Sequence, residues 1–364
     1  MILKATVLLI ALFALQRVWQ LSPGFGIHSK GYIHRPGPCR TVKPIQTGSE
    51  DITLTDNGIA FISSGLRLNL CKQLFDKKIQ QFTGRIYKFN FNDPGHAAVE
   101  VALPRELEKD FNPHGVSHWK DASSDELWLF VVNHRKDNDN VEVMKYNHEL
   151  NSLSLVRSVQ STMFTSVNDI LAVGPNSFYA SNDGYFHGCL RPLEVVVGLA
   201  LGSVVFFDGV TASLVVQRQS DLNSMALSKD GTRLFLTKTF EQQINIFNIS
   251  KENGNLMFDR AIDVGVSIDN IYADPVSDDL WLGAHSSMFL LSQHMTNLDV
   301  KAPSKVVRVH PLGLETDRFE SYELHSPFGD DGRLISGSSS AVYYQEKMLV
   351  GSISDTLVFC DIIV

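Results

Sequence analysis

The sequence has no run of Lys and Arg, and its 40 acidic residues outnumber its 32 basic ones, giving a formal net charge of −8 at pH 7. This balance argues against nucleic acid as a partner. The chain also has no Gly-x-Ser-x-Gly elbow, no zincin motif and no phosphate-binding loop, which disfavours a serine hydrolase or a nucleotide enzyme. After residue 30, no segment is long and apolar enough to span a bilayer.

The first 30 residues have the pattern of a targeting segment. Lys4 precedes an apolar run over residues 5–15, which has the length of a signal-peptide core and is short for a spanning helix. No small-x-small cleavage pattern follows, so two interpretations stay open: ordinary cleavage at an imperfect site, or retention as a hydrophobic anchor. Both predict a secreted, extracellular protein, and a retained segment would attach it to a membrane or a lipoprotein. In such a protein the sequon at Asn248 is a predicted glycosylation site.

A motif recurs six times between residue 50 and the C-terminus. Each copy has a polar lead, a short run with alternating apolar residues, a turn, and a second apolar run. Copies spaced roughly 45–70 residues apart, each with two strands about a turn, are typical of the blades of a β-propeller. We therefore predict an all-β propeller over residues 31–364. The leads are Glu50-Asp51, His114, Asn168-Asp169, Asn223, Asp269-Asn270 and Ser336-Gly337-Ser338.

The leads also predict where chemistry occurs, because the first strand of every propeller blade lines the central axis and equivalent positions converge there. Only His114 among the leads is a soft or nitrogen ligand, which disfavours zinc and copper. Carboxylate and amide oxygens suit Ca²⁺, and two carboxylates would balance its charge. Asp and Asn also cap turns, but five at one repeat position favour a metal site. The predicted ligands are Glu50, Asn168, Asn223, Asp269 and Asn270.

Asp51 and Asp169 each follow one of these ligands directly in the sequence. Side chains of consecutive strand residues point in opposite directions. The two carboxylates should therefore face away from the first site, where they could hold a second, buried ion.

Two histidines are candidates for proton transfer. His114 is itself a lead, and His134 ends the next apolar run. Because the two strands run out and back, the imidazoles can approach one another. A His near its usual pKa can take a proton from water, and a second His can pass that proton on. His285 faces the same opening on this pattern and is given no role.

Four cysteines occur in the chain, two of them near its ends. A bridge between Cys39 and Cys360 would close the ring and contribute at most roughly 4–6 kcal/mol on chain-entropy arguments. The sequence alone does not fix the pairing. Cys71 and Cys189 are expected to be free thiols. The apolar segment 185–201 is expected to form a surface helix, which either contacts lipid or packs on the propeller.

Together these motifs resemble the paraoxonase family of secreted, calcium-dependent lactonases and arylesterases. The resemblance implies a six-bladed propeller with two calcium ions in its tunnel. It also implies that the five predicted ligands bind the catalytic ion and that Asp51, Asp169 and the carbonyl of Val116 bind the structural one. It implies further that His114 and His134 form a catalytic dyad and that Cys39 pairs with Cys360. The motifs lie at 47–51, 57–65, 111–115, 129–134, 168–175, 181–186, 269–270 and 279–285.

The chain departs from the family pattern at Ala284, Gly184 and Leu68, where members often carry Cys, His and Tyr. These changes concern substrate range more than catalysis. The leading hypothesis is a calcium-dependent hydrolase of aryl esters and lactones, with phosphotriesters as a weak side substrate and a lipid, lipoprotein or membrane surface as partner. The rival is a calcium-stabilised propeller that binds lipid or a membrane partner without turnover; a membrane-attached, chaperone-like protein is a third hypothesis.

Overall fold

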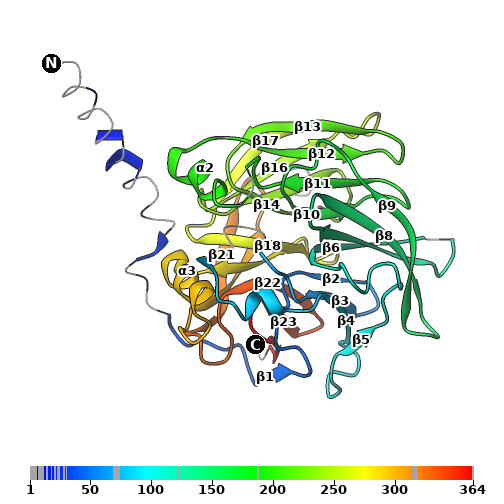
Figure 1. Ribbon diagram of the computed structural model, residues 1–364. Helices are drawn as coiled ribbons and strands as arrows, with labels where there is room; N and C mark the ends of the chain where they lie inside the picture. Colours follow the sequence, from blue (N-terminus) through cyan, green and yellow to red (C-terminus); the bar gives the residue numbers. More distant parts are fainter. Residues whose placement is uncertain are drawn as a thin grey trace.

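The computed structural model describes residues 31–68, 74–121, 123–186, 188–313 and 319–362, with isolated positions before residue 31. Six sheets of four antiparallel strands each are arranged about one axis (Figure 1). The predicted six-bladed propeller is therefore confirmed. The expected leader, residues 1–30, lies largely outside the described residues, as does Cys71. No helix among the described residues is long and apolar enough to cross a membrane.

The innermost strand of each sheet follows or contains one of the six polar leads. These strands contact each other in sequence order, and the last contacts the first, so they form a closed ring around the axis. They are β2 (Ile52–Leu54), β6 (Pro113–Lys120), β10 (Val167–Ala172), β14 (Leu222–Leu227), β18 (Ser267–Ala273) and β22 (Ser338–Tyr344).

The remaining strands step outward from this ring. The second strands are β3 (Ile59–Ser64), β7 (Leu127–His134), β11 (Phe178–Asn182), β15 (Arg233–Lys238), β19 (Leu280–His285) and β23 (Lys347–Ser352). The third strands are β4 (Arg85–Asn90), β8 (Asp139–Asn147), β12 (Gly202–Phe207), β16 (Gln243–Ile249), β20 (Ser304–Pro311) and β24 (Leu357–Asp361). The outer strands are β5 (Val99–Val101), β9 (Ser152–Val159), β13 (Ala212–Gln219), β17 (Leu256–Asp263), β21 (Tyr322–Asp330) and β1 (Cys39–Val42).

Apolar side chains fill the space between neighbouring sheets. Phe130 on β7 and Phe178 on β11 pack edge to face across one such interface, with ring centroids 6.0 Å apart. Burial of large aromatic and aliphatic side chains in this way is the main force that holds the blades together. The alternation seen in the sequence therefore marks the faces that adjacent blades bury against each other.

The ring is closed by the two ends of the chain. Strand β1 pairs with β24, and Cys39 lies directly opposite Cys360 in the register. The two residues form the predicted disulfide. Cys189, expected to be a free thiol, is also disulfide-bonded, so that prediction is wrong. Cysteine pairing depends on which loops meet in space, and loop positions are not encoded in a strand pattern.

Two helices lie on one side of the propeller, α2 (Arg191–Val197) and α3 (Met288–Thr296) (Figure 1); a short 3₁₀ turn, η2, spans Ile79–Gln81. Helix α2 falls inside the segment predicted to be helical, and Pro192 lies in its first turn. Both helices belong to connections between second and third strands. Such connections lie at the end of the ring where the innermost strands begin, so the helices cover the end that carries the polar leads.

Helix α2 is anchored by an ion pair that explains one departure from the family pattern. The buried Glu194 carboxylate accepts hydrogen bonds from the backbone N–H groups of Tyr185 and Phe186 and from Arg191. A Cβ atom at Gly184 would lie 2.4 Å from the Arg191 guanidinium carbon and 2.5 Å from Glu194 Oε2. A side chain at this position would therefore displace the Arg191–Glu194 pair that holds the helix down.

Candidate active site

Local backbone irregularities turn the polar leads towards the axis. In β10, β14 and β18 the pairing with the second strand shifts register at Asn168, at Asn223-Ser224 and at Asp269-Asn270. Such β-bulges interrupt strict alternation and re-aim side chains. All five predicted ligands of the first site are buried, and they come from four different blades.

Their hydrogen bonds leave a set of oxygens without partners. Asn223 Nδ2 donates to Asp269 Oδ1 at 2.8 Å and to Thr239 Oγ1 at 3.2 Å, and Asn270 Nδ2 donates to Glu50 Oε1 at 2.9 Å. The amide nitrogens are thus directed at neighbours. Within this group of five residues, the buried oxygens that accept no hydrogen bond from the described residues are Glu50 Oε2, Asn168 Oδ1, Asn223 Oδ1 and Asn270 Oδ1.

Buried acceptors without partners are rare, because leaving them unpaired costs free energy. A cation bound by these oxygens would remove that cost. The described residues contain no cluster of three or more His, Cys, Asp and Glu side chains that could hold a metal ion; this set has two carboxylates and draws its other oxygens from amides. Such a donor set suits Ca²⁺.

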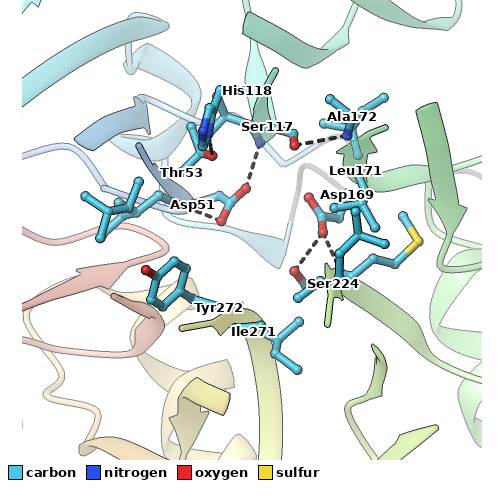
Figure 2. A pocket seen from close by; sticks show the side chains of 18 of the residues that line it. Asp51, Thr53, Ser117, His118, Asp169, Leu171, Ala172, Ser224, Ile271 and Tyr272 are labelled. Carbon is cyan, nitrogen blue, oxygen red and sulfur yellow. Dashed lines mark hydrogen bonds between the residues drawn. The ribbon is translucent and has the colours of Figure 1, made fainter. Parts of the chain in front are cut away.

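We call the set of five predicted ligands the upper site, and Asp51 and Asp169 the lower site. The lower site lines a cavity of about 310 Å³ that the residues of the upper site do not line. Figure 2 shows the two carboxylates on opposite sides of this cavity. Asp51 accepts from the N–H groups of Ile52 and Val116, each at 2.7 Å. Asp169 accepts from Ser224 Oγ at 2.7 Å and from Met225 N–H at 2.8 Å. The leads therefore fall into two layers. Because the adjacent residues Asp269 and Asn270 both belong to the upper layer, the bulges, and not alternation alone, determine which side chains share a layer.

The surroundings of both lower carboxylates disfavour their ionised form. Burial, with the neighbouring charges of Asp169 and Glu50, raises the pKa of Asp51 well above its usual value. Burial is also the largest cause that raises the pKa of Asp169, to about 6. Two buried carboxylates that raise each other's energy are stabilised when a cation sits between them. The lower pair therefore also fits a metal ion.

A glycine allows two neighbouring innermost strands to lie close together. A Cβ at Gly115 would lie 2.6 Å from the Asp169 Cα and 2.5 Å from its Oδ1. No side chain fits between β6 and β10 here. Gly115 therefore allows β6 to lie close against β10 beside Asp169.

The two predicted histidines are in contact. His114 Nδ1 lies 2.9 Å from His134 Nε2, and His114 Nε2 lies 3.6 Å from Glu50 Oε1. Burial lowers the pKa of His114, but the negative charges of Glu50, Asp183 and Asp269 outweigh this effect and raise the pKa to about 9. The base candidate and the oxygen cluster thus share one site.

Three further residues belong to this arrangement, and of these the sequence pattern places only His285 at the same opening, without a role. His285 Nε2 lies 2.9 Å from Asp269 Oδ2, and Ser224 bonds Asp169 as described. Asp139 Oδ1 lies 2.7 Å from His134 Nδ1. His285 and Asp139 lie on second and third strands, outside the repeat position that revealed the others.

Comparison with known proteins now decides the family. Residues 33–362 match the family described as Arylesterase. The chain belongs to the arylesterase family. This membership confirms the resemblance that the motifs indicate, and it makes the chain an esterase or lactonase.

Relatives in the arylesterase family align over most of their length. The chain is 30% identical to serum paraoxonase/arylesterase 2 of Gallus gallus over 326 residues, which cover 89% of this chain and 88% of that protein. It is 29% identical to serum paraoxonase/arylesterase 1 of Homo sapiens over 329 residues, with the same coverage. The alignment therefore covers nearly the whole propeller.

Solved structures of more distant proteins share the fold. A gluconolactonase from Xanthomonas campestris has a TM-score of 0.53 at 13% identity and covers 91% of both chains. Regucalcin from Agrobacterium tumefaciens, a calcium-binding protein, has a TM-score of 0.52 at 13% identity, covering 91% of this chain and 96% of that one. At these identities the likeness concerns the fold alone.

Proposed function

We propose that this arylesterase-family chain is a calcium-dependent hydrolase of aryl esters and lactones. The observation that carries the proposal is the set of four buried oxygens that have no hydrogen-bond partner among the described residues and lie beside the His114–His134 contact. Glu50, Asn168, Asn223, Asp269 and Asn270 would hold the catalytic ion. When bound, calcium would polarise the substrate carbonyl and stabilise the negative charge that develops on its oxygen.

The histidines supply proton transfer in this proposal. His114 accepts a proton from the attacking water through Nε2, the nitrogen that faces Glu50. His134, in contact through Nε2, helps to pass the proton on. Two of the carboxylates that raise the pKa of His114, Glu50 and Asp269, are proposed calcium ligands. A bound cation would offset their negative charge and lower the pKa of His114 towards neutral pH. Phosphotriesters are expected to be weak side substrates.

The lower site is proposed to hold a second, structural calcium ion through Asp51, Asp169 and the carbonyl of Val116. We predict that Asp169→Asn destabilises the calcium-loaded protein by about 3–5 kcal/mol, because the buried ion loses one of its two carboxylate ligands. In EDTA the same change should cost little or should stabilise, because it removes one of two neighbouring buried negative charges. Chemical unfolding in both buffers measures the two effects.

The matched control is Asp263→Asn, at an exposed position on β17, which should change neither curve. An equal loss of stability for Asp169→Asn with and without calcium would contradict the second ion site.

The leader and the sequon lead us to propose a secreted glycoprotein. Asn248 is exposed on β16, and its cross-strand neighbour Met257 is 67% exposed. A glycan on Asn248 would shield this apolar side chain. Protein secreted from eukaryotic cells should lose mass on N-glycosidase treatment, and Ser250→Ala should abolish that loss. No mass change for the unaltered protein would contradict glycosylation at this site.

A lipid, lipoprotein or membrane surface is proposed as the partner of the segment around α2. Its apolar side chains are exposed beside the end of the tunnel that carries the site. They are Tyr185, Leu190, Val196, Val197, Leu199 and Leu201. Contiguous exposed apolar side chains of this kind mark interaction surfaces.

Hydrolysis of phenyl acetate and of a δ-lactone by the purified protein tests the proposed function. The proposal predicts turnover of both substrates in calcium-containing buffer and loss of turnover in EDTA. Absence of turnover with either substrate would favour the rival, a calcium-stabilised propeller that binds lipid without catalysis.

A further inference from the structure

A carboxylate lies behind the histidine pair, on the side away from the axis. Asp139 begins β8 directly opposite His134, the last residue of β7, in the hairpin that joins these strands. Its Oδ1 is 2.7 Å from His134 Nδ1, and its Oδ2 accepts a hydrogen bond from the Val167 N–H at 2.8 Å. The side chains of His134 and Asp139 are only 13% and 11% exposed. Both oxygens of the carboxylate are thus fixed, one by β7 and one by β10.

The hydrogen bonds determine where the ring protons lie. An ionised carboxylate only accepts hydrogen bonds, so His134 carries its proton on Nδ1. Neutral His134 then has a lone pair on Nε2, and the 2.9 Å contact requires His114 to donate from its Nδ1. Neutral His114 is consequently left with a lone pair on Nε2, the nitrogen that faces Glu50 and the axis.

We propose that Asp139 is a positioning residue that sets the tautomers of both histidines, so that His114 presents an unprotonated Nε2 to the attacking water. The inference rests on the proposed function and adds a third member to its proton-transfer pair. The arrangement has the logic of a Ser-His-Asp triad, in which the carboxylate touches no substrate but holds the imidazole in the reactive tautomer.

Asp139→Asn should reverse the chain of hydrogen bonds. The Val167 N–H requires an acceptor, so the amide oxygen of Asn stays on that side and its NH₂ group faces His134 Nδ1. His134 must then carry its proton on Nε2 and donate to His114 Nδ1. His114 in turn carries its proton on Nε2 and cannot accept one from water. The substitution preserves size and both contacts, yet removes the base.

The experiment compares Asp139→Asn with the unaltered protein, His114→Gln and Asp137→Asn in calcium-loaded, full-length protein. Asp137 lies in the same hairpin turn and is exposed, so its substitution removes the same charge without touching the histidines. Two quantities are measured: kcat and KM for phenyl acetate and a δ-lactone, and the tautomers of the ring nitrogens by ¹⁵N NMR with labelled histidine.

We expect Asp139→Asn to lower kcat by about 10²–10⁴-fold, the range of general-base catalysis, with KM and melting temperature nearly unchanged. Its NMR spectrum should show protons moved from Nδ1 to Nε2 in both rings. Asp139→Glu, which keeps an acceptor, should recover part of the rate. Asp137→Asn should match the unaltered protein in every measurement.

Two results would overturn the role of Asp139 while leaving the proposed function intact: a normal kcat for Asp139→Asn when His114→Gln is impaired, or a lost rate with unchanged tautomers. If the unaltered protein hydrolyses both substrates and His114→Gln does so equally well, the histidine pair of the proposed function fails instead. The two failures are therefore distinguishable.

Discussion

Replacing His114 with Gln is expected to lower kcat for aryl esters and lactones by about 10²–10⁴-fold, the contribution typical of general-base catalysis. Gln keeps polar atoms near the position of the ring but cannot accept a proton at neutral pH. Calcium affinity should change little, because His114 is not one of the proposed ligands. Steady-state kinetics and equilibrium calcium binding on the same preparation separate the two effects.

The pH dependence provides a further check on the same base. Because His114 acts in its neutral form, the rate of the unaltered protein should rise as pH increases through the pKa of His114. That rising limb should disappear in His114→Gln. His134→Gln should cost less than His114→Gln, since it removes only the second acceptor. A His114→Gln variant that retains most of its lactonase rate would show that another base, such as a ligand carboxylate, activates water.

Replacing Asp269 or Asn223 with Ala is expected to abolish hydrolysis and to lower calcium affinity. Asn223 contributes an unpaired buried oxygen, and its amide group also donates to Asp269 Oδ1. Asp269 is one of only two carboxylates that balance the charge of the ion at the upper site. Each change therefore removes both an oxygen ligand and a contact that orients its neighbour.

Calorimetric titration of calcium, together with phenyl acetate hydrolysis, measures these losses. Asp263→Ala is the matched control, because it removes an exposed carboxylate that bonds only Gln243 among the described contacts. If either ligand variant hydrolysed esters at the normal rate with normal calcium affinity, the oxygen cluster would not be the catalytic ion site.

The repeat position explains why so much of the site was predictable from the sequence. Glu50, Asn168, Asn223 and the Asp269-Asn270 pair each introduce the innermost strand of a blade, where equivalent positions converge on the axis. Alternation predicts that Asp51 and Asp169 face away from the first site, and both do line a separate cavity, although a bulge at Asn168 also contributes to the position of Asp169. His114 and His134 follow from the out-and-back course of two adjacent strands.

The parts that the sequence does not reveal depend on contacts between elements. Asp139 carries no repeat signature; only the register of β7 with β8 shows that it lies opposite His134. Ser224 reaches Asp169 because β14 shifts register between Leu222 and Met225, and a bulge of this kind has no sequence signature here. The disulfide at Cys189 depends on which segment of the chain lies beside it, and a strand pattern does not encode that position.

Calcium titration of metal-stripped protein tests the central claim most directly. The protein is treated with EDTA and the chelator is removed. Calcium is then added in steps, and at each step both the amount of bound calcium and the rate of phenyl acetate hydrolysis are recorded. We predict no hydrolysis at the start, recovery in proportion to occupancy of the upper site, and poor recovery with Mg²⁺, which demands a smaller octahedral set. Full hydrolysis by the metal-stripped protein before any calcium is added would contradict the account.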